Sequence, residues 1–443
     1  MAVFAQTNPG GPLPKDILHP CSMDVTAACS IVKLPGPGRY AFNYQAQLTT
    51  TPKGTWLCVW TQGSYESERD QRVVLARSSD AGRTWSAEVP IEEAGAGYRV
   101  PAWIMIYCVP HTGRVYVFYW YNHDGVPLRD AGDIFFRFSD DDGYTWSSRF
   151  PLHIPRKPID DPIGSLHGWN FGQPRLLPTG QVLFTFNKMR RSAMFPPGWR
   201  LDEKDAWVRP ADAAPDAPEP LSGGSPNAWE TEVWLLECEN LLTETEPERL
   251  RFRLLPEGEE GLWVPYPGSE RHFGQEGTLV SLSGGRLLCV FRSRQGHPYH
   301  SASADCGRTW SRPDALRYCP GGEALAQPCA PCPIHKMADG RFVLLFHNVM
   351  PLEAGWYPRD PLWVAVAREA PGVTENAGLF FAAPKVLLYN DRVPGGPFRD
   401  TEICYPQFYE IAGEPYVVYT NKTSEIRINE IPPELLDDHG LPR

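Results

Sequence analysis

Three short stretches of the chain share one pattern: SSDAGRTW at residues 78–85, SDDDGYTW at residues 139–146 and SADCGRTW at residues 303–310. Each reads Ser-x-Asp-x-Gly-x-Thr-Trp, with five fixed positions among eight, and a further Ser follows each copy. Three chance copies of such a pattern in one chain are very improbable. The internal repeat is therefore the strongest indication of the fold in this sequence.

The residue types of the pattern indicate a tight turn between strands. Asp and Ser side chains can bond nearby backbone N–H groups, Gly can adopt a positive φ, and Trp can pack between neighbouring sheets. Strand-like runs precede the first copy, GTWLCVW at residues 54–60 and QRVVLARS at residues 71–78. We therefore interpret the Asp residues of the pattern as structural and leave them out of the catalytic set.

The pattern resembles the Asp-box, or BNR, repeat of the sialidase superfamily of glycoside hydrolases, whose members fold as β-propellers, usually with six blades. Signals of a Gly turn followed by an apolar strand recur along the chain and mark six units, near residues 39–86, 98–148, 170–240, 270–311, 328–388 and 400–430. We expect an all-β, six-bladed β-propeller with Asp-box hairpin turns, and seven blades as the alternative. Residues 1–443 are expected to form this single domain.

Two segments outside the repeats have expected places in the propeller. The N-terminal segment around residues 12–35 is predicted to supply the outer strand of the last blade, so that it closes the ring. A Pro-, Ala- and Asp-rich stretch near residues 190–230 is predicted to be an insertion in the third unit. Such an insertion can cover a binding face or remain a solvated loop.

The composition of the chain restricts its possible binding partners and its cellular location. The formal charge is −11, from 42 basic and 53 acidic residues, and no long run of Lys or Arg occurs, which argues against nucleic acid or an anionic membrane as partner. No apolar run is long enough to span a membrane, and the start of the sequence lacks a secretion signal; a cytoplasmic location is expected. The 11 Cys, several of them in strand-like runs, are expected to be mostly buried free thiols.

The resemblance also implies a catalytic site. Members of the superfamily bind the substrate carboxylate with three arginines, attack with a Tyr that a Glu activates, and protonate with an Asp; no metal or organic cofactor is implied. A planar guanidinium suits this task because it binds a carboxylate through two parallel hydrogen bonds. The stretch GQEGTLVSLSGGRLLCVFRSRQG at residues 274–296 resembles the family pattern that contains the Glu and one arginine, here Glu276 and Arg292.

Two further stretches resemble later parts of the family pattern. YPRDPLWVAVA at residues 357–367 supplies Arg359 as a carboxylate ligand, and DTEICYPQFYEIAGEPYVVYTNK at residues 400–422 supplies Tyr405 as the nucleophile. A phenol has a pKa of about 10 and needs a base within hydrogen-bond reach. Glu276 is the candidate base.

The sequence departs from the family at the first arginine and at the acid. FNYQAQLTTTPKGTW at residues 42–56 occupies the place of the family's first Arg motif and contains no arginine. Residues 98–103, YRVPAW, resemble that motif one unit later, which makes Arg99 a candidate ligand and Asp124, 25 residues on, a candidate acid. Glu66, Glu68 and Asp70 are rival acids.

The leading hypothesis is an exo-acting, retaining glycosidase of the sialidase type that releases a terminal acidic, sialic-acid-like sugar from a glycan or glycoconjugate. Two alternatives stay open. A propeller hydrolase or lyase could act on another acidic glycan, such as a uronate, with His347 or His300 as the base of a lyase. A non-catalytic propeller could bind glycans through an aromatic cleft.

Overall fold

The computed structural model describes residues 15–26, 29–34, 40–66, 68–125, 130–162, 164–191, 230–350, 358–390 and 402–441, with short pieces at 200–201, 207–208 and 211. Within these ranges the regular elements are β-strands and five 3₁₀ helices of three or four residues: η1 (Lys15–Ile17), η4 (Pro247–Arg249), η5 (Ser283–Gly285), η6 (Glu375–Gly378) and η8 (Pro433–Leu436). None of the described helices has the length and hydropathy to cross a membrane.

The strands form one sheet after another along the chain. The first sheet contains β3 (Phe42–Thr50), β4 (Trp56–Gly63), β5 (Arg72–Ser78) and β6 (Val89–Glu92). The second contains β7 (Pro101–Cys108), β8 (Val115–Tyr121), β9 (Asp133–Ser139) and β10 (Phe150–Pro151). The third contains β11 (Gly168–Asn170), β12 (Arg175–Leu176), β13 (Val182–Arg190), β16 (Glu230–Cys238), β17 (Phe252–Leu255), β18 (Val264–Pro265) and β19 (His272–Phe273).

Three more sheets complete the ring. The fourth contains β20 (Gln275–Ser281), β21 (Leu287–Arg292), β22 (Pro298–Ser303) and β23 (Asp314–Ala315). The fifth contains β24 (Ile334–Lys336), β25 (Phe342–Phe346), β26 (Leu362–Glu369), β27 (Leu379–Phe381), β28 (Lys385–Tyr389) and β1 (Met23–Asp24). The sixth contains β29 (Ile403–Ile411), β30 (Glu414–Asn421), β31 (Glu425–Glu430) and β2 (Ser30–Lys33). A separate pair, β14 (Arg200–Leu201) and β15 (Trp207–Val208), stands outside them.

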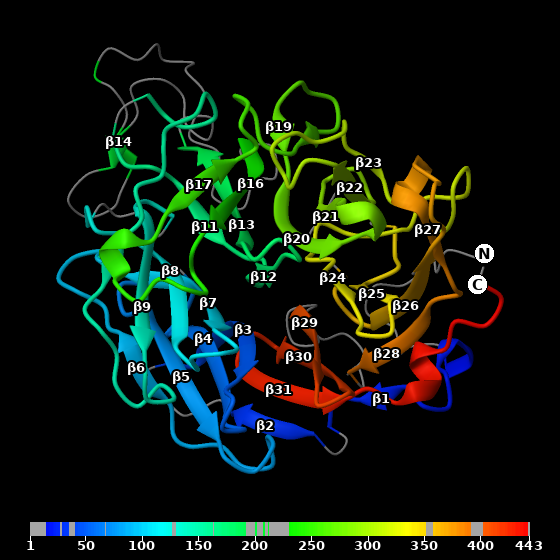
Figure 1. The fold of residues 1–443 in the computed structure, drawn as a ribbon, viewed down its shortest axis with the longest axis horizontal. Coiled ribbons are helices and arrows are strands. Elements are labelled where there is room, and N and C mark those ends of the chain that lie inside the picture. Colours follow the sequence, from blue (N-terminus) through cyan, green and yellow to red (C-terminus); the bar gives the residue numbers. More distant parts are fainter. Residues whose placement is uncertain are drawn as a thin grey trace.

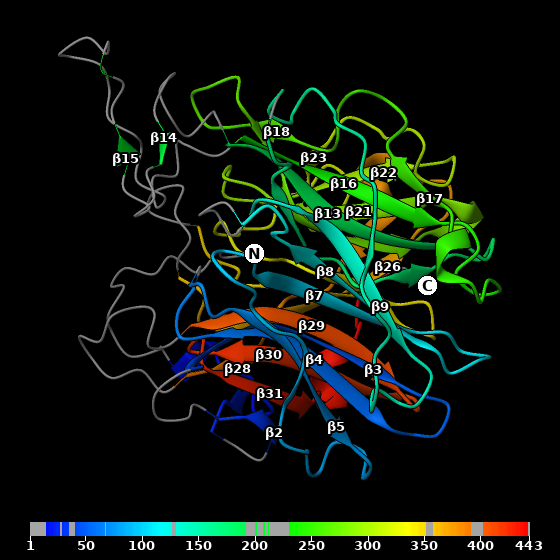
Figure 2. The same cartoon turned by 90° about the vertical axis from the view of Figure 1, so that its left-hand side faces the viewer.

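The architecture is an all-β propeller. In Figure 1 the sheets follow one another around a ring in chain order, with β3, β12, β20, β24 and β29 near its centre. The side view in Figure 2 shows the strands of neighbouring sheets stacked at an angle to one another. Strands from different sheets thus approach one another at the axis, where residues from distant parts of the chain can meet.

The N-terminal segment closes the ring, as predicted. β2 runs antiparallel to β31, with Ser30 opposite Ile428 and Ile31 opposite Arg427. β1 adds a parallel strand to the edge of the fifth sheet through β28. Pairing of this kind covers strand edges that would otherwise expose unpaired N–H and C=O groups.

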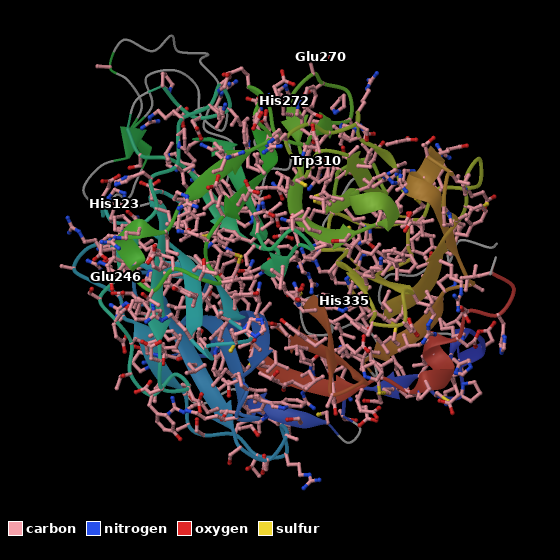
Figure 3. All side chains as sticks on the ribbon, viewed as in Figure 1. His123, Glu246, Glu270, His272, Trp310 and His335 are labelled. Atoms are coloured by element: carbon pink, nitrogen blue, oxygen red, sulfur yellow. The ribbon has the colours of Figure 1, made fainter. Side chains whose placement is uncertain are left out.

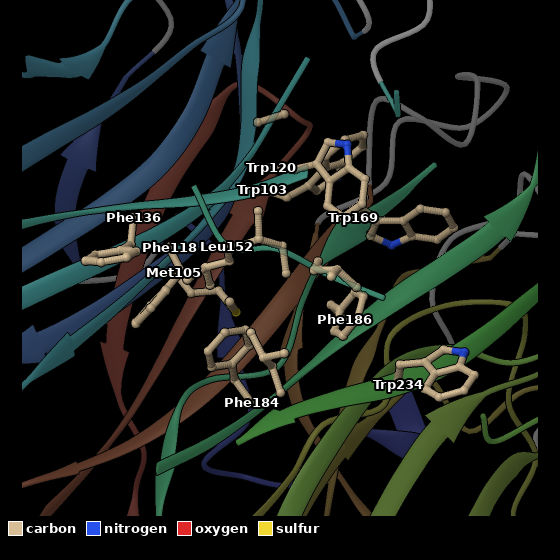
Figure 4. Packing of buried hydrophobic residues seen from close by; sticks show 14 of the residues in the cluster. Trp103, Met105, Phe118, Trp120, Phe136, Leu152, Trp169, Phe184, Phe186 and Trp234 are labelled. Atoms are coloured by element: carbon tan, nitrogen blue, oxygen red, sulfur yellow. The ribbon is translucent and has the colours of Figure 1, made fainter. Parts of the chain in front are cut away.

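The core lies between adjacent sheets. The largest apolar cluster joins the second and third sheets and is dominated by aromatic side chains, among them Trp103, Phe118, Trp169 and Phe184 (Figure 4). The ring centroids of Phe118 and Phe184 lie 4.9 Å apart, a normal distance for an aromatic pair. Such packing fixes the angle between one sheet and the next.

The three repeated turns have one hydrogen-bond pattern. In the first, Asp80 accepts bonds from the Thr84 N–H (2.9 Å), the Thr84 hydroxyl (2.6 Å) and the Ser78 hydroxyl (2.7 Å). The turns at Asp141 and Asp305 repeat these contacts. The Asp oxygens are thus occupied within the turn, which supports a structural role.

The Gly and Trp of the first turn meet neighbouring strands. Gly82 has φ +81°, and a Cβ there would stand 2.8 Å from the ring of Trp56, so a larger residue would be both strained and crowded. Trp85 packs, partly buried, against the apolar cluster that joins the first and sixth sheets. Trp146 and Trp310 lie in the same way against clusters between other sheets.

All eleven cysteines carry free thiols. Cys58, Cys108, Cys238 and Cys289 are buried in strands, as the sequence predicts. Most of the predicted insertion near residues 190–230 lies outside the described residues.

Candidate active site

Four of the inner strands share one irregularity near their first residues. β3, β7, β20 and β29 each lose register with the next strand over two residues, and the first of these has a positive φ: Gln45 (59°), Trp103 (50°), Glu276 (55°) and Tyr405 (49°). A β-bulge of this kind turns a side chain away from the regular alternation of the strand. Left-handed backbone in non-Gly residues is costly and concentrates at functional sites.

The predicted base and nucleophile occupy two of these bulges, and two predicted arginines lie beside them. The Arg292 Nη1 is 2.8 Å from the Glu276 Oε2. The Arg359 Cζ is 5.9 Å from the ring centroid of Tyr405. The charges of Glu276, Arg359 and Arg292 all act on the pKa of Tyr405. Side chains from the fourth, fifth and sixth sheets therefore meet at one end of the axis.

Glu276 is a buried carboxylate held from several sides. Its side chain is 2% exposed, and its backbone N–H donates to the Asn187 Oδ1 at 2.8 Å. Burial raises the pKa of Glu276, while the charges of Arg292 and Arg359 and a hydrogen bond from Trp169 oppose that rise. A carboxylate with a raised pKa is a stronger base, which is what removal of a phenol proton requires.

Tyr405 stands among aromatic rings next to these charges. Its ring centroid is 5.9 Å from that of Tyr44 and 6.3 Å from that of Phe171. Burial, and after it the negative charge of Glu276, raises the pKa of Tyr405 well above its ordinary value. The phenol is therefore protonated at neutral pH, and it could react only as its proton passes to a base.

The Arg292 guanidinium contacts two neighbouring side chains, those of Gln275 and Glu276. Its Nε and Nη2 both donate to the Gln275 Oε1, at 3.0 and 2.5 Å, while Nη1 pairs with Glu276. These bonds fix the guanidinium plane and place its charge next to the base. The predicted role of Arg292 as a substrate ligand remains a prediction.

Arg359 borders a second buried base. Its Nη1 donates to the Cys404 Sγ at 3.3 Å, and its charge lowers the pKa of His347. The His347 Nδ1 lies 3.2 Å from the Pro361 carbonyl oxygen, so Nδ1 carries the proton. Nε2 is buried without a hydrogen-bond partner among the described residues. Burial, more than Arg359, lowers the pKa of His347 to about 3, so this ring stays neutral with an open lone pair.

Arg99 and Asp124 lie apart from this cluster in their contacts. The Arg99 Nε donates to the His123 carbonyl oxygen at 3.1 Å. Asp124 accepts a bond from the Ser165 hydroxyl and lies 3.1 Å from the His123 Nδ1. Figure 3 shows His123 at the rim of the ring. Both residues are exposed, and their roles stay predictions.

The first sheet offers a nearer acid. The negative charge of Glu66, one of the rival acids, raises the pKa of both Glu276 and Tyr405, which places it at the same end of the axis. Asp70, another rival, instead accepts bonds from the Ser64 N–H and hydroxyl at 3.0 and 3.1 Å. Of these two rival acids, Glu66 is the one whose charge acts on Glu276 and Tyr405.

Two polar side chains near the site, Gln45 and Arg294, are not among the residues predicted from the sequence. Gln45 occupies the bulge of the first sheet; its side-chain amide is buried and has no hydrogen-bond partner within the described ranges. With Gln47, Asn170, Gln407 and two apolar side chains it lines a cavity of about 10 Å³, enough for about one water. Arg294 is 3% exposed, and its charge acts with those of Arg292 and Arg359 on the pKa of the Cys329 thiol.

A signal for Arg294 was present in the sequence. Arg292 and Arg294 are two residues apart in FRSR, and residues two apart on an extended chain point to the same side. Gln45 had no such signal, since its position depends on the bulge. In the part of the chain that the structure describes, no group of three or more His, Cys, Asp or Glu side chains could hold a metal ion.

The fold is similar to those of solved sialidase structures. The NanB sialidase from Streptococcus pneumoniae matches with a TM-score of 0.59 and 10% identity over 94% of this chain and 72% of its own. A leech intramolecular trans-sialidase, solved with 2,7-anhydro-Neu5Ac, matches with a TM-score of 0.60 and 11% identity over 93% of this chain and 71% of its own.

A Dyadobacter fermentans protein of unknown function also matches, with a TM-score of 0.59 and 13% identity over 93% of this chain and 99% of its own. No family model and no curated protein matches the sequence. The similarity is thus one of structure, at identities that establish the fold alone. The chain has the sialidase β-propeller fold.

Proposed function

We propose that this protein is an exo-acting, retaining glycosidase that releases a terminal acidic, sialic-acid-like sugar, with Tyr405 as nucleophile and Glu276 as its base. The observation that carries the proposal is the meeting of Tyr405, Glu276, Arg292 and Arg359 at one end of the axis. We further infer that the six large sheets are six blades of one domain over residues 1–443, and that the three repeated turns are Asp boxes.

The chemistry follows from the environment of Tyr405. In the proposed reaction the Tyr405 oxygen bonds to the anomeric carbon as its proton passes to Glu276, the glycosidic C–O bond breaks, and an acid protonates the departing oxygen. Water, activated by the conjugate base of that acid, then cleaves the glycosyl–Tyr405 bond, and Glu276 returns its proton to the Tyr405 oxygen. A sugar whose anomeric carbon bears a carboxylate repels an anionic attacker, so a neutral phenol suits it; sialidases are the known case of a Tyr nucleophile. Because the Tyr405 pKa is raised, proton transfer and attack have to occur together.

Substrate recognition would rest on arginines. Arg359 and Arg294 are buried cations at this end of the axis, and a guanidinium binds a carboxylate through two charge-assisted bonds. Gln45 stands at the bulge of the first sheet and offers an amide there. Glu66 is the acid that we favour, with Asp124 as the alternative.

A covalent trap tests the proposal directly. A 2,3-difluorosialic acid should form a stable adduct on the peptide that contains Tyr405, detected by mass spectrometry, and aryl sialosides should be hydrolysed. Tyr405→Phe should lose both reactions and still bind the ligand, because only the hydroxyl is removed. Tyr416→Phe, in the neighbouring strand β30, is the matched control. Wild-type turnover in Tyr405→Phe would refute the mechanism.

A second function would use His347. Its neutral imidazole has an open Nε2 beside Arg359 and could remove the proton next to a uronate carboxylate, which would start a β-elimination; its lowered pKa makes it a weaker base than an ordinary histidine. Uronate-containing oligosaccharides should then give an unsaturated product with new ultraviolet absorbance, and His347→Gln should abolish it. If neither aryl sialosides nor uronates react but acidic glycans bind, the protein is a glycan-binding propeller.

A further inference from the structure

A pocket of about 530 Å³ opens at the other end of the inner strands. On β20, Glu276 is the second residue, and Ser281, which lines the pocket, is the last. On β29, Glu410 lies five residues beyond Tyr405, roughly 17 Å along a strand that rises about 3.4 Å per residue. The pocket is therefore separate from the candidate active site, with which it shares the axis.

Cationic and donor groups from two sheets line this pocket. The Arg175 Nη2 donates to the His335 Nδ1 at 3.0 Å. Because a guanidinium can only donate, Nδ1 is the acceptor and the neutral ring carries its proton on Nε2. The Lys336 Nζ donates to the Ser281 carbonyl oxygen at 3.1 Å and has two further protons. Figure 3 shows His335 near the centre of the ring.

The positive charges have no acidic partner within the described residues. Neither Arg175 nor Lys336 forms an ion pair there. The carboxylate that lines the pocket, Glu410, instead accepts a bond from the Ala338 N–H at 2.8 Å. Burial lowers the pKa of Arg175 to about 10, as expected for a cation withdrawn from water without a counter-charge. Arg175 is only partly buried, and a partly desolvated charge of this kind is stabilised when an anion pairs with it.

The remaining wall is apolar. Leu176, which is 43% exposed, lines the pocket beside the buried side chains of Leu279, Leu287 and Met337. The volume falls within the usual range for small-ligand sites, which combine apolar walls with a few polar groups. An inorganic ion would leave most of this wall uncovered, whereas an organic anion with an apolar body would use both parts.

We propose that this end of the axis is a second binding site, for a small organic oxyanion whose carboxylate or phosphate bonds to Arg175 and Lys336 and whose apolar body packs on Leu176 and Met337. His335 would donate its Nε2–H to the same group or to a neighbouring oxygen of the ligand. The site does not depend on the proposed hydrolase activity, because none of its residues belongs to the candidate active site.

The test uses Met337 as a local reporter. The chain has 7 Met, so methyl-labelled methionine gives few NMR signals, and Met337→Leu identifies the signal of Met337. The probes are 4-methylbenzoate and phenyl phosphate, with 4-methylbenzyl alcohol as the uncharged control. We expect one or both anions, but not the alcohol, to shift the Met337 signal saturably. The difference between the two anions tells a carboxylate ligand from a phosphate ligand.

Variants assign the binding to this pocket. Arg175→Gln and Lys336→Gln should each weaken binding at least tenfold, equivalent to about 1.4 kcal/mol, while the other methionine signals show that the protein remains folded. Lys53→Gln is the matched control, because it removes one charge from a side chain that is 70% exposed and lies outside the pocket. An unmoved Met337 signal with both anions, or wild-type affinity in Arg175→Gln, would overturn the proposal.

Discussion

The side chains at the four bulges determine which chemical groups are presented at one end of the axis. Gln45, Trp103, Glu276 and Tyr405 occupy the same register position of four inner strands, each with a positive φ. The same type of β-bulge thus presents an amide, an indole, a carboxylate and a phenol at the same end of the axis. The chemistry of the site depends on which side chain each bulge carries, and the sheets behind them need not change.

Removal of the proposed base should separate binding from turnover. Glu276→Gln keeps the size of the side chain and loses its ability to take the Tyr405 proton, so kcat should fall by about 10² to 10⁴, the usual contribution of a general base. Ligand affinity, measured by calorimetry, should change little. A variant with normal kcat would show that another group activates Tyr405.

The pH profile should report the charge pair at Glu276. The carboxylate must be ionised to accept a proton, so kcat/KM should fall as the pH drops through its raised pKa. Arg292 stabilises the ionised form; Arg292→Gln should therefore raise that pKa further and move the acidic limb to higher pH. The measurement is kcat/KM against pH for both proteins. If the acidic limb of kcat/KM lies at the same pH in both proteins, Arg292 does not influence the pKa of the catalytic base.

At the scale of elements, the repeated turns should contribute stability and no chemistry. Trp85→Ala removes a partly buried ring from the cluster between the first and sixth sheets. We expect a loss of about 2 kcal/mol, below the roughly 3–5 kcal/mol of a fully buried aromatic. Chemical denaturation measures this loss, and kcat of the folded variant should be that of the wild type. Reduced kcat at unchanged stability would contradict the structural role.

The same turns should make stability depend on acid. Hydrogen bonds from Thr84 and Ser78 lower the pKa of Asp80 to about 2 from an ordinary 3.8. This contribution is fully present above the ordinary pKa and is lost as the pH falls through about 2. Asp80→Asn should therefore show a smaller loss of Tm between these two pH values than the wild type does. Equal losses in both proteins would place the acid sensitivity elsewhere.

Local patterns in the sequence predicted much of this structure, and long-range register explains what they missed. The Ser-x-Asp-x-Gly-x-Thr-Trp turns and the run before Arg292 are local, so the propeller and the neighbourhood of Glu276 could be predicted. The positive φ of Gln45 and the open Nε2 of His347 arise from pairing with other strands and from burial, which no short pattern encodes. Arg99 resembled a family motif, yet its contacts lie at His123.

At the scale of the whole molecule, the contribution of β2 to closure of the ring can be tested by substitution. Val32 on β2 is buried in the cluster between the first and sixth sheets, whereas Ile31 beside it is 42% exposed. Val32→Asp should cost at least about 2 kcal/mol, because it loses the burial of an apolar side chain and buries a charge. Ile31→Asp is the matched control and should cost little. Equal effects in calorimetric melting would show that β2 is not needed for closure.

Closure also sets an order of events during synthesis. Ser30 pairs with Ile428, about 400 residues later in the chain. At about 5–20 residues per second, a nascent β2 waits roughly 20 to 80 seconds on the ribosome before the strand that it pairs with exists. Earlier sheets can form as they emerge, but the last one must pair with a strand that was made about 400 residues earlier. Newly made molecules should therefore pass through a state in which the ring is still open. In that state the unpaired strand edges are exposed, and chaperones can bind them.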